Sequence, residues 1–584
     1  MFNRRKKALL GIIMSIAILC SGCAGGRNNS ANVNTGVDVN ADTNVAAETD
    51  VKVDTGDFRK ESAYSLMQTV NSSLADHSID DKYRTFYEIF PYSFADSDGD
   101  GIGDLNGIIQ NLDYLNDDDE NTDTDLNING IWLMPVMPSP SYHKYDVTDY
   151  MDIDPEYGTL EDFKALMAEC EKRDIHVIID LVMNHTSSEH PWFMEGCKYL
   201  ESLPQEAEPD SSVCPYVDYY HFSKEKQANY HQVGDSEWYY EGQFWAGMPD
   251  LNMENEAVIE EFDQITDFWL DLGVSGFRLD AVGEYESDNV TKSTEILRQF
   301  VTEMKTKNPD IYLVGEIWSD MSTYTQYYDS GIDSCFDFAF ADSTGIIANT
   351  IKGAKNYNAS SFGKAQVNIQ DTIQSRNTDG IDAPFYTNHD MARGAGYYSG
   401  DNSEAQTKIA QAMNLFMSGN AFLYYGEELG MKGSGKDENK RAPMFWSSDK
   451  QAEGMCSGPK DMDLVKMKYG SYEEQREDGD SVFQFVKETI KIRNAFPEIA
   501  RGQVTFEEAC SNDSICTIRK SFDGNEILLV YNISENPEQI DLRTLSLNNS
   551  TDKKLAAILL TGTEALTYDK GVLLMPSYSV AVLQ

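Results

Sequence analysis

The chain has 584 residues, a formal net charge of −50 and 41% apolar residues. This length exceeds one ordinary domain, and the apolar content is enough for a large core. So acidic a surface would repel nucleic acid and anionic headgroups, which favours a neutral partner and excludes a nucleic-acid-binding role. Solubility alone would also explain the charge. Aromatic residues, at 11%, fit sugar-stacking faces or an aromatic core equally well.

The N-terminus has the features of an export signal. Basic residues at 4–7 precede an apolar run over 8–19, which is too short to span a bilayer comfortably. The small residues before Cys23 resemble a bacterial lipoprotein signal, which predicts a signal peptide over 1–22 and a lipid on Cys23. We then expect an extracellular protein anchored to the cell membrane. An ordinary signal peptide cleaved nearby is the alternative, and both readings place the protein outside the cytoplasm.

The segment after the signal is poor in groups that could form a core. Residues 24–56 contain no aromatic side chain and consist mostly of Asn, Ala, Asp, Thr, Val and Gly. Such a segment cannot bury enough apolar surface to become ordered. We therefore predict a flexible linker over 23–80 that holds a folded body away from the membrane.

Seven cysteines remain beyond the signal, and an odd number forbids complete pairing within the chain. Cys197 with Cys214, and Cys510 with Cys516, are close enough in sequence to form bridges. Their spacing does not indicate a metal site.

Eight apolar, β-rich runs alternate with helical patterns through the middle of the chain. The runs are 85–90, 130–135, 176–182, 276–281, 311–318, 335–340, 384–388 and 421–426. Segments 160–173 and 257–272 between them carry apolar residues at helical spacing. Eight strands alternating with helices predict a closed (β/α)8 barrel.

Two stretches depart from this alternation. Residues 187–247, rich in Tyr, Pro, His and Trp, predict an irregular domain inserted after the third strand. Beyond residue 499, short alternating runs predict an antiparallel β-sandwich domain over 500–584. The barrel then occupies 81–186 and 248–499.

Three carboxylates follow predicted barrel strands. Asp280, Glu316 and Asp390 end the fourth, fifth and seventh strands, at spacings of about one and two β/α units. Polar residues at the C-terminal ends of barrel strands face one pocket, so we expect these side chains to converge.

Such carboxylates can cleave a glycosidic bond, which requires one ionised and one protonated carboxyl group. Arg278 shares a strand face with Asp280 and should hold it as a carboxylate nucleophile. Apolar neighbours and a facing carboxylate should raise the pKa of Glu316, as an acid requires. Asp390 can bind sugar hydroxyls more tightly as the ring flattens towards the transition state.

Four segments, DLVMNH (180–185), GFRLDAVGE (276–284), VGEIW (314–318) and FYTNHD (385–390), resemble in order the conserved regions of the α-amylase family of glycoside hydrolases. The resemblance extends from about residue 82 to the C-terminus. It implies Asp280 as nucleophile, Glu316 as acid/base and Asp390 as transition-state stabiliser. The resemblance also implies substrate-pocket roles for Arg278, His185 and His389.

Further aromatic residues fit the same resemblance. Tyr145 resembles the family's ring that stacks on the cleaved sugar, with His143 nearby; a core aromatic is the alternative. Trp245 and Phe244 could extend this aromatic track. MPDLN (248–252) resembles a group intermediate between oligo-1,6-glucosidases and neopullulanases, which includes bacterial lipoprotein α-amylases.

An acidic loop follows the first strand. Asp96, Asp98, Asp100 and Asp104 occupy positions 1, 3, 5 and 9, and the carbonyl of Ile102 would be at position 7. Hard cations prefer such oxygens, so the loop predicts a structural Ca²⁺ site, with a plain acidic turn as the alternative. An EF-hand is excluded because position 12 is Gly rather than Glu. The loop resembles the calcium loop of oligo-1,6-glucosidase-like proteins.

These features predict an endo-acting, retaining hydrolase of α-1,4-glucosidic bonds in starch and related α-glucans, acting as a monomer. Family exo-glucosidases resemble one another in an acidic residue three positions before the stacking Tyr. Here Tyr142 occupies that position, which predicts a pocket without an acidic end. The alternatives are a glucanotransferase, an exo-acting α-glucosidase or neopullulanase-like enzyme, and a non-catalytic glucan-binding protein.

Overall fold

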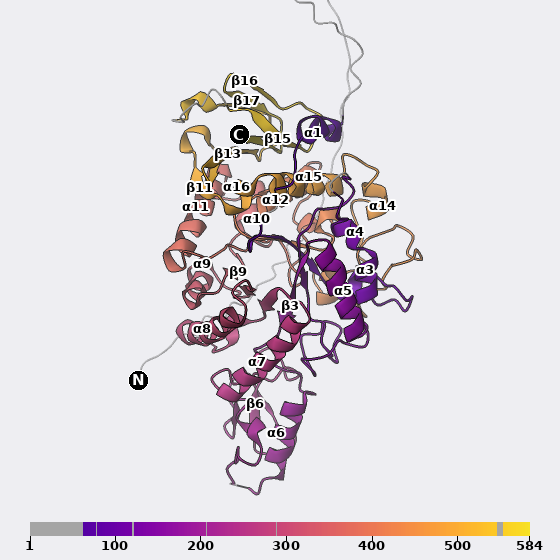
Figure 1. Cartoon of the computed structure of the whole chain (residues 1–584), viewed down its shortest axis with the longest axis vertical. Coiled ribbons are helices and arrows are strands. Elements are labelled where there is room, and N and C mark those ends of the chain that lie inside the picture. Colours follow the sequence, from indigo (N-terminus) through magenta and orange to yellow (C-terminus); the bar gives the residue numbers. More distant parts are fainter. Residues whose placement is uncertain (1–61, 78, 120–121, 206, 288, 546–552) are drawn as a thin grey trace, which may run out of the picture. The chain divides into compact units, whose positions relative to one another are not determined.

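Figure 1 shows the computed structural model, which describes residues 62–77, 79–119, 122–205, 207–287, 289–545 and 553–584. The predicted signal peptide, Cys23 and residues 24–61 of the predicted linker lie outside these residues. Within the described ranges, no helix combines the length and apolar character needed to cross a bilayer.

A curled sheet of seven parallel strands forms the centre of the fold, in the order β10-β1-β2-β3-β7-β8-β9. Nearly every residue of these strands is buried, as expected when a parallel sheet is covered on both faces. The strands are β1 (Thr85–Ile89), β2 (Gly130–Leu133), β3 (His176–Leu181), β7 (Gly276–Leu279), β8 (Tyr312–Gly315), β9 (Ser334–Cys335) and β10 (Ala421–Tyr424).

The predicted seventh strand, 384–388, is not a regular strand. Two isolated parallel bridges, Phe336 with Ala383 and Phe385 with Phe422, join the chain beyond β9 to β10 at this position and complete the ring. Pro384 has no N–H for a ladder, although its carbonyl accepts from the Phe422 N–H. The architecture is therefore the predicted (β/α)8 barrel, with the seventh position reduced to bridges.

Side chains from around the ring fill the barrel interior as one apolar cluster. Phe86 of β1 stacks on Phe422 of β10 at 4.8 Å between ring centroids, and Trp132 of β2 packs against Phe336. The cluster also takes residues from the bridged segment at 383–385. Side-chain packing inside the barrel is therefore continuous at the seventh position, where the hydrogen-bond ladder between strands is interrupted.

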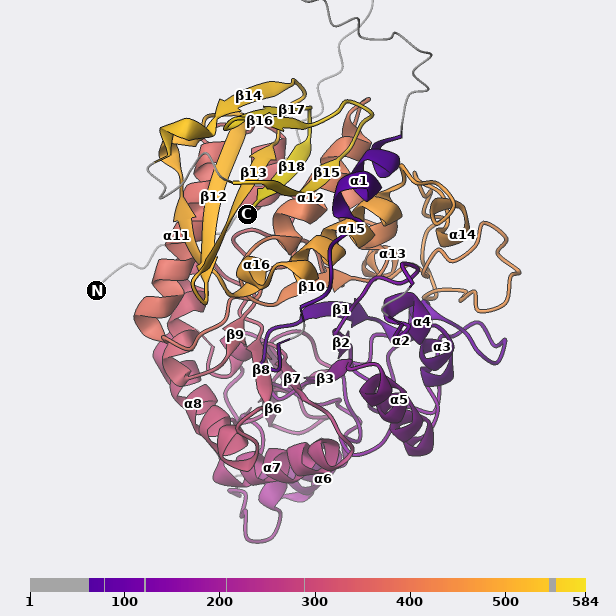
Figure 2. The same cartoon turned by 45° about the horizontal axis from the view of Figure 1, so that its top comes forward.

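Helices surround the sheet (Figures 1 and 2). The predicted helices at 160–173 and 257–272 are present as α5 and α7; Thr159 and Asp162 form a capping box at the start of α5. The helices outside the inserted domain, from α2 onward, are α2 (Pro91–Phe94), α3 (Leu105–Gln110), α4 (Leu112–Leu115), α5 (Leu160–Lys172), α7 (Glu256–Asp271), α8 (Val290–Lys307), α9 (Met321–Tyr324), α10 (Ile346–Ile351), α11 (Ala359–Arg376), α12 (Ser403–Leu415), α13 (Asp437–Lys440), α14 (Tyr472–Gln475), α15 (Val482–Ala495) and α16 (Pro497–Arg501).

The segment between β3 and α7 is more regular than the sequence indicated. It contains α6 (Pro191–Ser202) and a small antiparallel sheet in the order β4-β6-β5. The rings of Phe193 and Tyr240 pack edge to face at 4.7 Å, which joins the helix to the sheet. The strands are β4 (Phe222–Ser223), β5 (Tyr230–Gln232) and β6 (Tyr239–Glu241).

The C-terminal region forms two antiparallel sheets, in the orders β11-β12-β13-β18-β15 and β14-β17-β16. The alternating pattern over 572–583 divides into two strands, β17 and β18, one in each sheet. The strands are β11 (Gln503–Phe506), β12 (Ile515–Phe522), β13 (Asn525–Asn532), β14 (Glu538–Asp541), β15 (Leu555–Leu560), β16 (Thr567–Asp569), β17 (Val572–Met575) and β18 (Ser579–Leu583).

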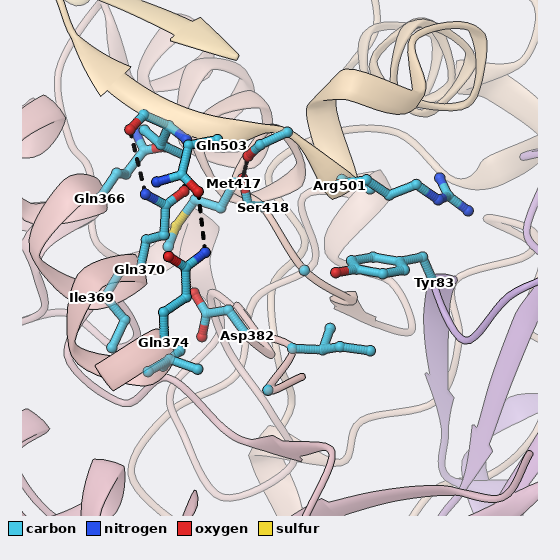
Figure 3. A pocket seen from close by; sticks show the side chains of 17 residues that line it. Tyr83, Gln366, Ile369, Gln370, Gln374, Asp382, Met417, Ser418, Arg501 and Gln503 are labelled. Carbon is cyan, nitrogen blue, oxygen red and sulfur yellow. Dashed lines mark hydrogen bonds between the residues drawn. The ribbon is translucent and has the colours of Figure 1, made fainter. Parts of the chain in front are cut away.

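Glutamines join this region to the barrel beside a cavity of about 80 Å³ (Figure 3). Gln370 of α11 exchanges hydrogen bonds with the backbone of Val504 on β11, and Gln374 donates to Gln503 at 3.2 Å. The first strand of the C-terminal region is therefore fixed to a barrel helix.

Part of the predicted linker is folded, so the boundary at residue 80 is wrong. Helix α1 (Ala63–Asn71) packs against β15 and α15, with Met67 and Asn71 buried. The Asn71 amide accepts from the Ile558 N–H and donates to its carbonyl. β15 is an edge strand, and Asn71 supplies the hydrogen bonds that a neighbouring strand would provide.

Neither of the two bridges that proximity in sequence left possible is present. All seven cysteines in the described part of the chain are free thiols, including Cys197, Cys214, Cys510 and Cys516. The Cys510 thiol is 3.1 Å from the Thr544 hydroxyl, whereas Cys516 is buried in β12. Proximity in sequence did not bring these sulfur atoms together.

Candidate active site

A pocket of about 440 Å³ lies beyond the C-terminal ends of the barrel strands. It brings together Asp280, Glu316 and Asp390, as the strand positions predicted. The remaining lining residues are His143, Tyr145, His185, Phe244, Trp245, Met248, Ala281, Gly283, Glu284, Trp318, Asp437 and Arg441. Arg278 and His389 lie beneath this lining and are almost fully buried.

One guanidinium holds three carboxylates at the base of the pocket. Arg278 Nη1 is 2.5 Å from Asp280 Oδ1 and 2.7 Å from Asp180 Oδ1, while Nη2 is 2.8 Å from Glu316 Oε2. These residues come from β3, from β7 and its end, and from the end of β8, which are neighbours in the sheet. Parallel register therefore creates this cluster and fixes Asp280 and Glu316 on the same cation.

Glu316 lies in an environment that favours its protonated form. Burial raises its pKa to about 7; Arg278 opposes the shift, and Asp280 and Asp390 add to it. This is the direction that the sequence predicted. The Ala281 N–H donates to Glu316 Oε2 at 3.1 Å, and Ala281 adopts a φ of 48°, in the left-handed region. The chain thus turns sharply after Asp280 and aims a backbone donor at the acid.

Asp390 has the opposite environment. Burial opposes its ionisation, but His389 and Arg441 beside it hold its pKa well below the usual range. His389 Nε2 is 3.1 Å from Asp390 Oδ2, and Arg441 Nη2 is 3.0 Å from Oδ1. Glu316 and Asp390 therefore line one pocket in different protonation states near neutral pH.

The predicted stacking residue Tyr145 is fixed from several sides. Its hydroxyl donates to Asp180 Oδ2 at 2.8 Å, and its ring stacks on His389 at 5.4 Å between centroids. His185 Nε2 is 3.2 Å from the Tyr145 carbonyl.

The turn before Tyr145 is held by a buried lysine. Lys144, with a φ of 64°, forms ion pairs with Asp154 and Glu156. The strained turn thereby presents Tyr145 and His143 to the pocket.

Aromatic side chains line the mouth of the pocket and remain exposed. Phe244, Trp245 and Trp318 are 51%, 53% and 57% exposed, which is unusual for rings of this size. Trp318, two residues after Glu316, packs against Phe338 at 5.1 Å between ring centroids. Exposed rings beside a pocket that contains carboxylates can stack on sugar faces.

Two further residues of the pocket, Asp437 and Arg441, were not predicted from the sequence. Asp437 and Arg441 both line it and form an ion pair, so the pocket contains an acidic residue from another segment although position 142 is a Tyr. Tyr142 is not among the described residues that line this pocket. Its ring packs edge-on against Phe90 and Tyr92, and its hydroxyl donates to Asp437 at 2.8 Å.

Asp180, which contacts Arg278, was also not predicted as a site residue. It could have been found from the sequence, because it opens the DLVMNH segment at the end of a strand. Asp437 and Arg441 belong to no motif, and α13, on which the first of them lies, has only four residues.

The acidic loop after β1 forms a compact cluster. Single carboxylate oxygens of Asp96, Asp98 and Asp104 lie within 4.8 Å of one another. Asp100 is not a member of this group; its carboxylate accepts from the Ile102 N–H at 2.7 Å. Asp104 also caps α3 through the Gly107 N–H. The structure thus assembles three of the four predicted carboxylate ligands.

Comparison with known proteins gives a consistent result. Residues 88–502 match the family model described as the α-amylase catalytic domain. The chain is similar to Eubacterium rectale Amy13B, with 51% identity, a TM-score of 0.85 and coverage of 88% of this chain and 98% of that structure. Alpha-amylase 3 of Dictyoglomus thermophilum is 35% identical over 81% of this chain and 88% of its own length. Glucan 1,6-alpha-glucosidase of Streptococcus pneumoniae is 30% identical over 82% and 94%.

Proposed function

The chain belongs to the α-amylase family of glycoside hydrolases, and on that premise we propose that it cuts α-1,4-glucosidic bonds within starch and related α-glucans, retaining the anomeric configuration. The observation that carries the proposal is the shared Arg278 guanidinium, which holds Asp280 and Glu316 together. Retaining glycosidases need the shorter carboxyl separation, about 5–5.5 Å.

The proposed reaction assigns one role to each carboxyl group. The Asp280 carboxylate attacks the anomeric carbon while protonated Glu316 gives its proton to the departing glycosidic oxygen, leaving a covalent glycosyl ester. Glu316, now ionised, then takes a proton from a water that attacks the same carbon and frees Asp280. Asp390, ionised throughout, binds sugar hydroxyls more tightly as positive charge develops on the ring.

Cleavage inside the chain is supported by the exposed rim. Phe244, Trp245 and Trp318 provide exposed stacking faces for further sugars of a long glucan chain. The Asp437–Arg441 pair favours the alternative, an exo-acting α-glucosidase, because a fixed ion pair in the pocket could bind a terminal sugar. The named relatives include both an α-amylase and a glucan 1,6-alpha-glucosidase.

A time course on amylose and on pullulan separates these functions. Endo action on α-1,4 bonds should abolish iodine staining of amylose well before glucose accumulates, while the α-1,6 bonds of pullulan survive. Glucose as the first and dominant product would establish the exo alternative. Redistribution of chain lengths without new reducing ends would indicate a glucanotransferase, and binding without any of these products a glucan-binding protein.

We also propose that the loop after β1 holds one Ca²⁺. The donor set fits, since Asp96, Asp98 and Asp104 offer hard carboxylate oxygens that have already been brought together. Asp100 and the Ile102 carbonyl are the further ligands that the sequence predicts. The ion would have a structural role, neutralising charge in the loop that leads into α3.

The proposed location is the outer side of a bacterial cell membrane, with a lipid on Cys23 as the anchor. The support comes from the basic, apolar and small-residue segments of the N-terminus. A monomer that meets glucan outside the cell fits this arrangement.

A further inference from the structure

Glu88 on β1 makes a buried contact with the active site although it does not line the pocket. Its Oε1 is 2.6 Å from His389 Nδ1, and both side chains are 1% exposed. A carboxylate this deeply buried is costly unless its partner is charged and hydrogen-bonded. The contact therefore constrains the protonation of His389.

The other nitrogen of His389 faces the pocket residues. Nε2 lies 3.1 Å from Asp390 Oδ2 and 2.9 Å from the Tyr145 hydroxyl. That hydroxyl also donates to Asp180, so its proton is already engaged elsewhere. The titratable groups that face His389 are Glu88 from β1, Tyr145 from the loop after β2, Asp180 from β3, Glu316 from the end of β8, and Asp390.

We propose that Glu88 is a positioning residue that keeps His389 an imidazolium across the working pH range, so that Nε2–H always donates towards Asp390 and substrate hydroxyls. A neutral imidazole with its proton on Nδ1 would keep the contact to Glu88 but lose the donor on Nε2. Burial alone would lower the pKa of His389, but Asp390 and Glu88 together raise it to about 10.

Replacing Glu88 by Gln tests the charge while keeping an acceptor for Nδ1–H. On soluble starch, we expect kcat of E88Q to stay within about threefold of wild type at pH 5 and to fall at least about tenfold below wild type by pH 8, because Asp390 alone then opposes the burial that lowers the pKa of His389. The pH profile of kcat for E88Q should therefore fall more steeply on its alkaline side than that of wild type, and KM should change less than kcat. Glu88→Asp keeps the charge and should restore much of the activity at pH 8.

Glu428 provides the matched control. It is also a fully buried glutamate, but it accepts from the hydroxyls of Tyr87 and Tyr114 rather than from an active-site residue. We expect Glu428→Gln to lower the melting temperature without changing the shape of the pH profile. A pH-independent loss in E88Q, matching that of E428Q, would overturn the positioning role.

Direct titration of His389 makes the test independent of the proposed substrate. The proposal rests on the hydrolase activity, but the imidazole NMR signal of His389, identified by its absence in His389→Asn, reports protonation without turnover. It should stay in the imidazolium position to pH 8 in wild type and titrate in E88Q. Titration near pH 6.5 in wild type would refute the Glu88 role, whereas an inactive wild type with the expected titration would refute only the proposed function.

Discussion

The chemistry of this protein depends on a few side chains whose protonation is set by their neighbours. Arg278 touches Asp180, Asp280 and Glu316, while Asp390 is held by His389 and Arg441. Burial and the facing carboxylates bias Glu316 towards the acid form against the opposing effect of Arg278, whereas His389 and Arg441 bias Asp390 towards the ionised form. Two carboxyl groups in one pocket can thus have opposite roles.

The roles of Asp280 and Glu316 predict large losses on neutral replacement. Asp280→Asn removes the nucleophile and should lower kcat on starch by about 10⁴-fold or more. Glu316→Gln removes the proton donor and should lower it by about 10²–10⁴-fold. Unchanged circular dichroism and melting temperature would show that the fold survives. Proton NMR of fresh product should show the α-anomer first; initial β-anomer would contradict the retaining mechanism.

The raised pKa of Glu316 predicts the alkaline side of the pH profile. Since the acid must carry its proton, kcat/KM should fall as pH rises through about 7. His389 stays protonated through this range and Asp390 stays ionised, so one group should control this limb. Rates measured between pH 5 and 9 should show a slope of one proton; activity constant to pH 9 would mean that Glu316 is not the acid.

At the scale of elements, two short segments, helix α1 and the acidic loop after β1, could not be placed from the periodicity of apolar residues in the sequence. Helix α1 covers the edge strand β15, and the acidic loop after β1 leads into α3. In α1, the Asn71 side chain hydrogen-bonds to the backbone of Ile558, and in the loop, the Asp104 carboxylate accepts from the backbone N–H of Gly107.

Asn71 predicts the contribution of α1. Asn71→Ala leaves the N–H and carbonyl of Ile558 without partners in a buried position, so the free energy of unfolding should fall by about 1–3 kcal/mol. Urea denaturation measures this change. Thr69→Ala, on the exposed side of the same helix, should have little effect. Equal effects of the two substitutions would show that the Asn71 amide has no specific role.

Calcium should stabilise the acidic loop. Ligand binding to the folded state alone raises stability by mass action, so a chelator should lower the melting temperature of wild type. Asp98→Ala should lower it similarly and should abolish the chelator effect. Glu453→Ala, an exposed acidic residue that is not part of the cluster, serves as the control. A melting temperature unaffected by both the chelator and D98A would leave the loop as an acidic turn.

At the scale of the whole molecule, a barrel with an inserted segment and a C-terminal β region follows a long N-terminal stretch. The described residues between 62 and 584 form one compact unit by their internal contacts. Catalysis should therefore be independent of the N-terminal stretch, whose proposed function is attachment.

Attachment through Cys23 can be measured in a bacterial host. The full chain should partition with the membrane fraction, whereas Cys23→Ala should move it to the soluble exported fraction with unchanged activity per molecule. Cys456→Ala, far along the chain from the signal, is the control and should leave partitioning unchanged. Membrane association that survives Cys23→Ala would exclude the lipid anchor.

The sequence by itself determined the barrel and most of the pocket. Parallel strands buried on both faces appear as apolar runs, and their C-terminal ends carry the reactive residues, so Asp280, Glu316 and Asp390 could be placed from order and spacing alone. The direction of the Glu316 pKa shift followed from its apolar neighbours. Periodicity also located both ends of α5 and of α7 to within one residue.

Only the tertiary structure decided the features that depend on contacts distant in sequence. Arg441 reaches Asp390 across 51 residues, Glu88 reaches His389 across 301, and Asn71 reaches Ile558 across 487. The local sequence pattern does not predict such partners, because each of these side chains, taken alone, is also compatible with an ordinary surface or core position. Likewise, the cysteines stayed unpaired because the fold, rather than their spacing, sets the distance between sulfur atoms.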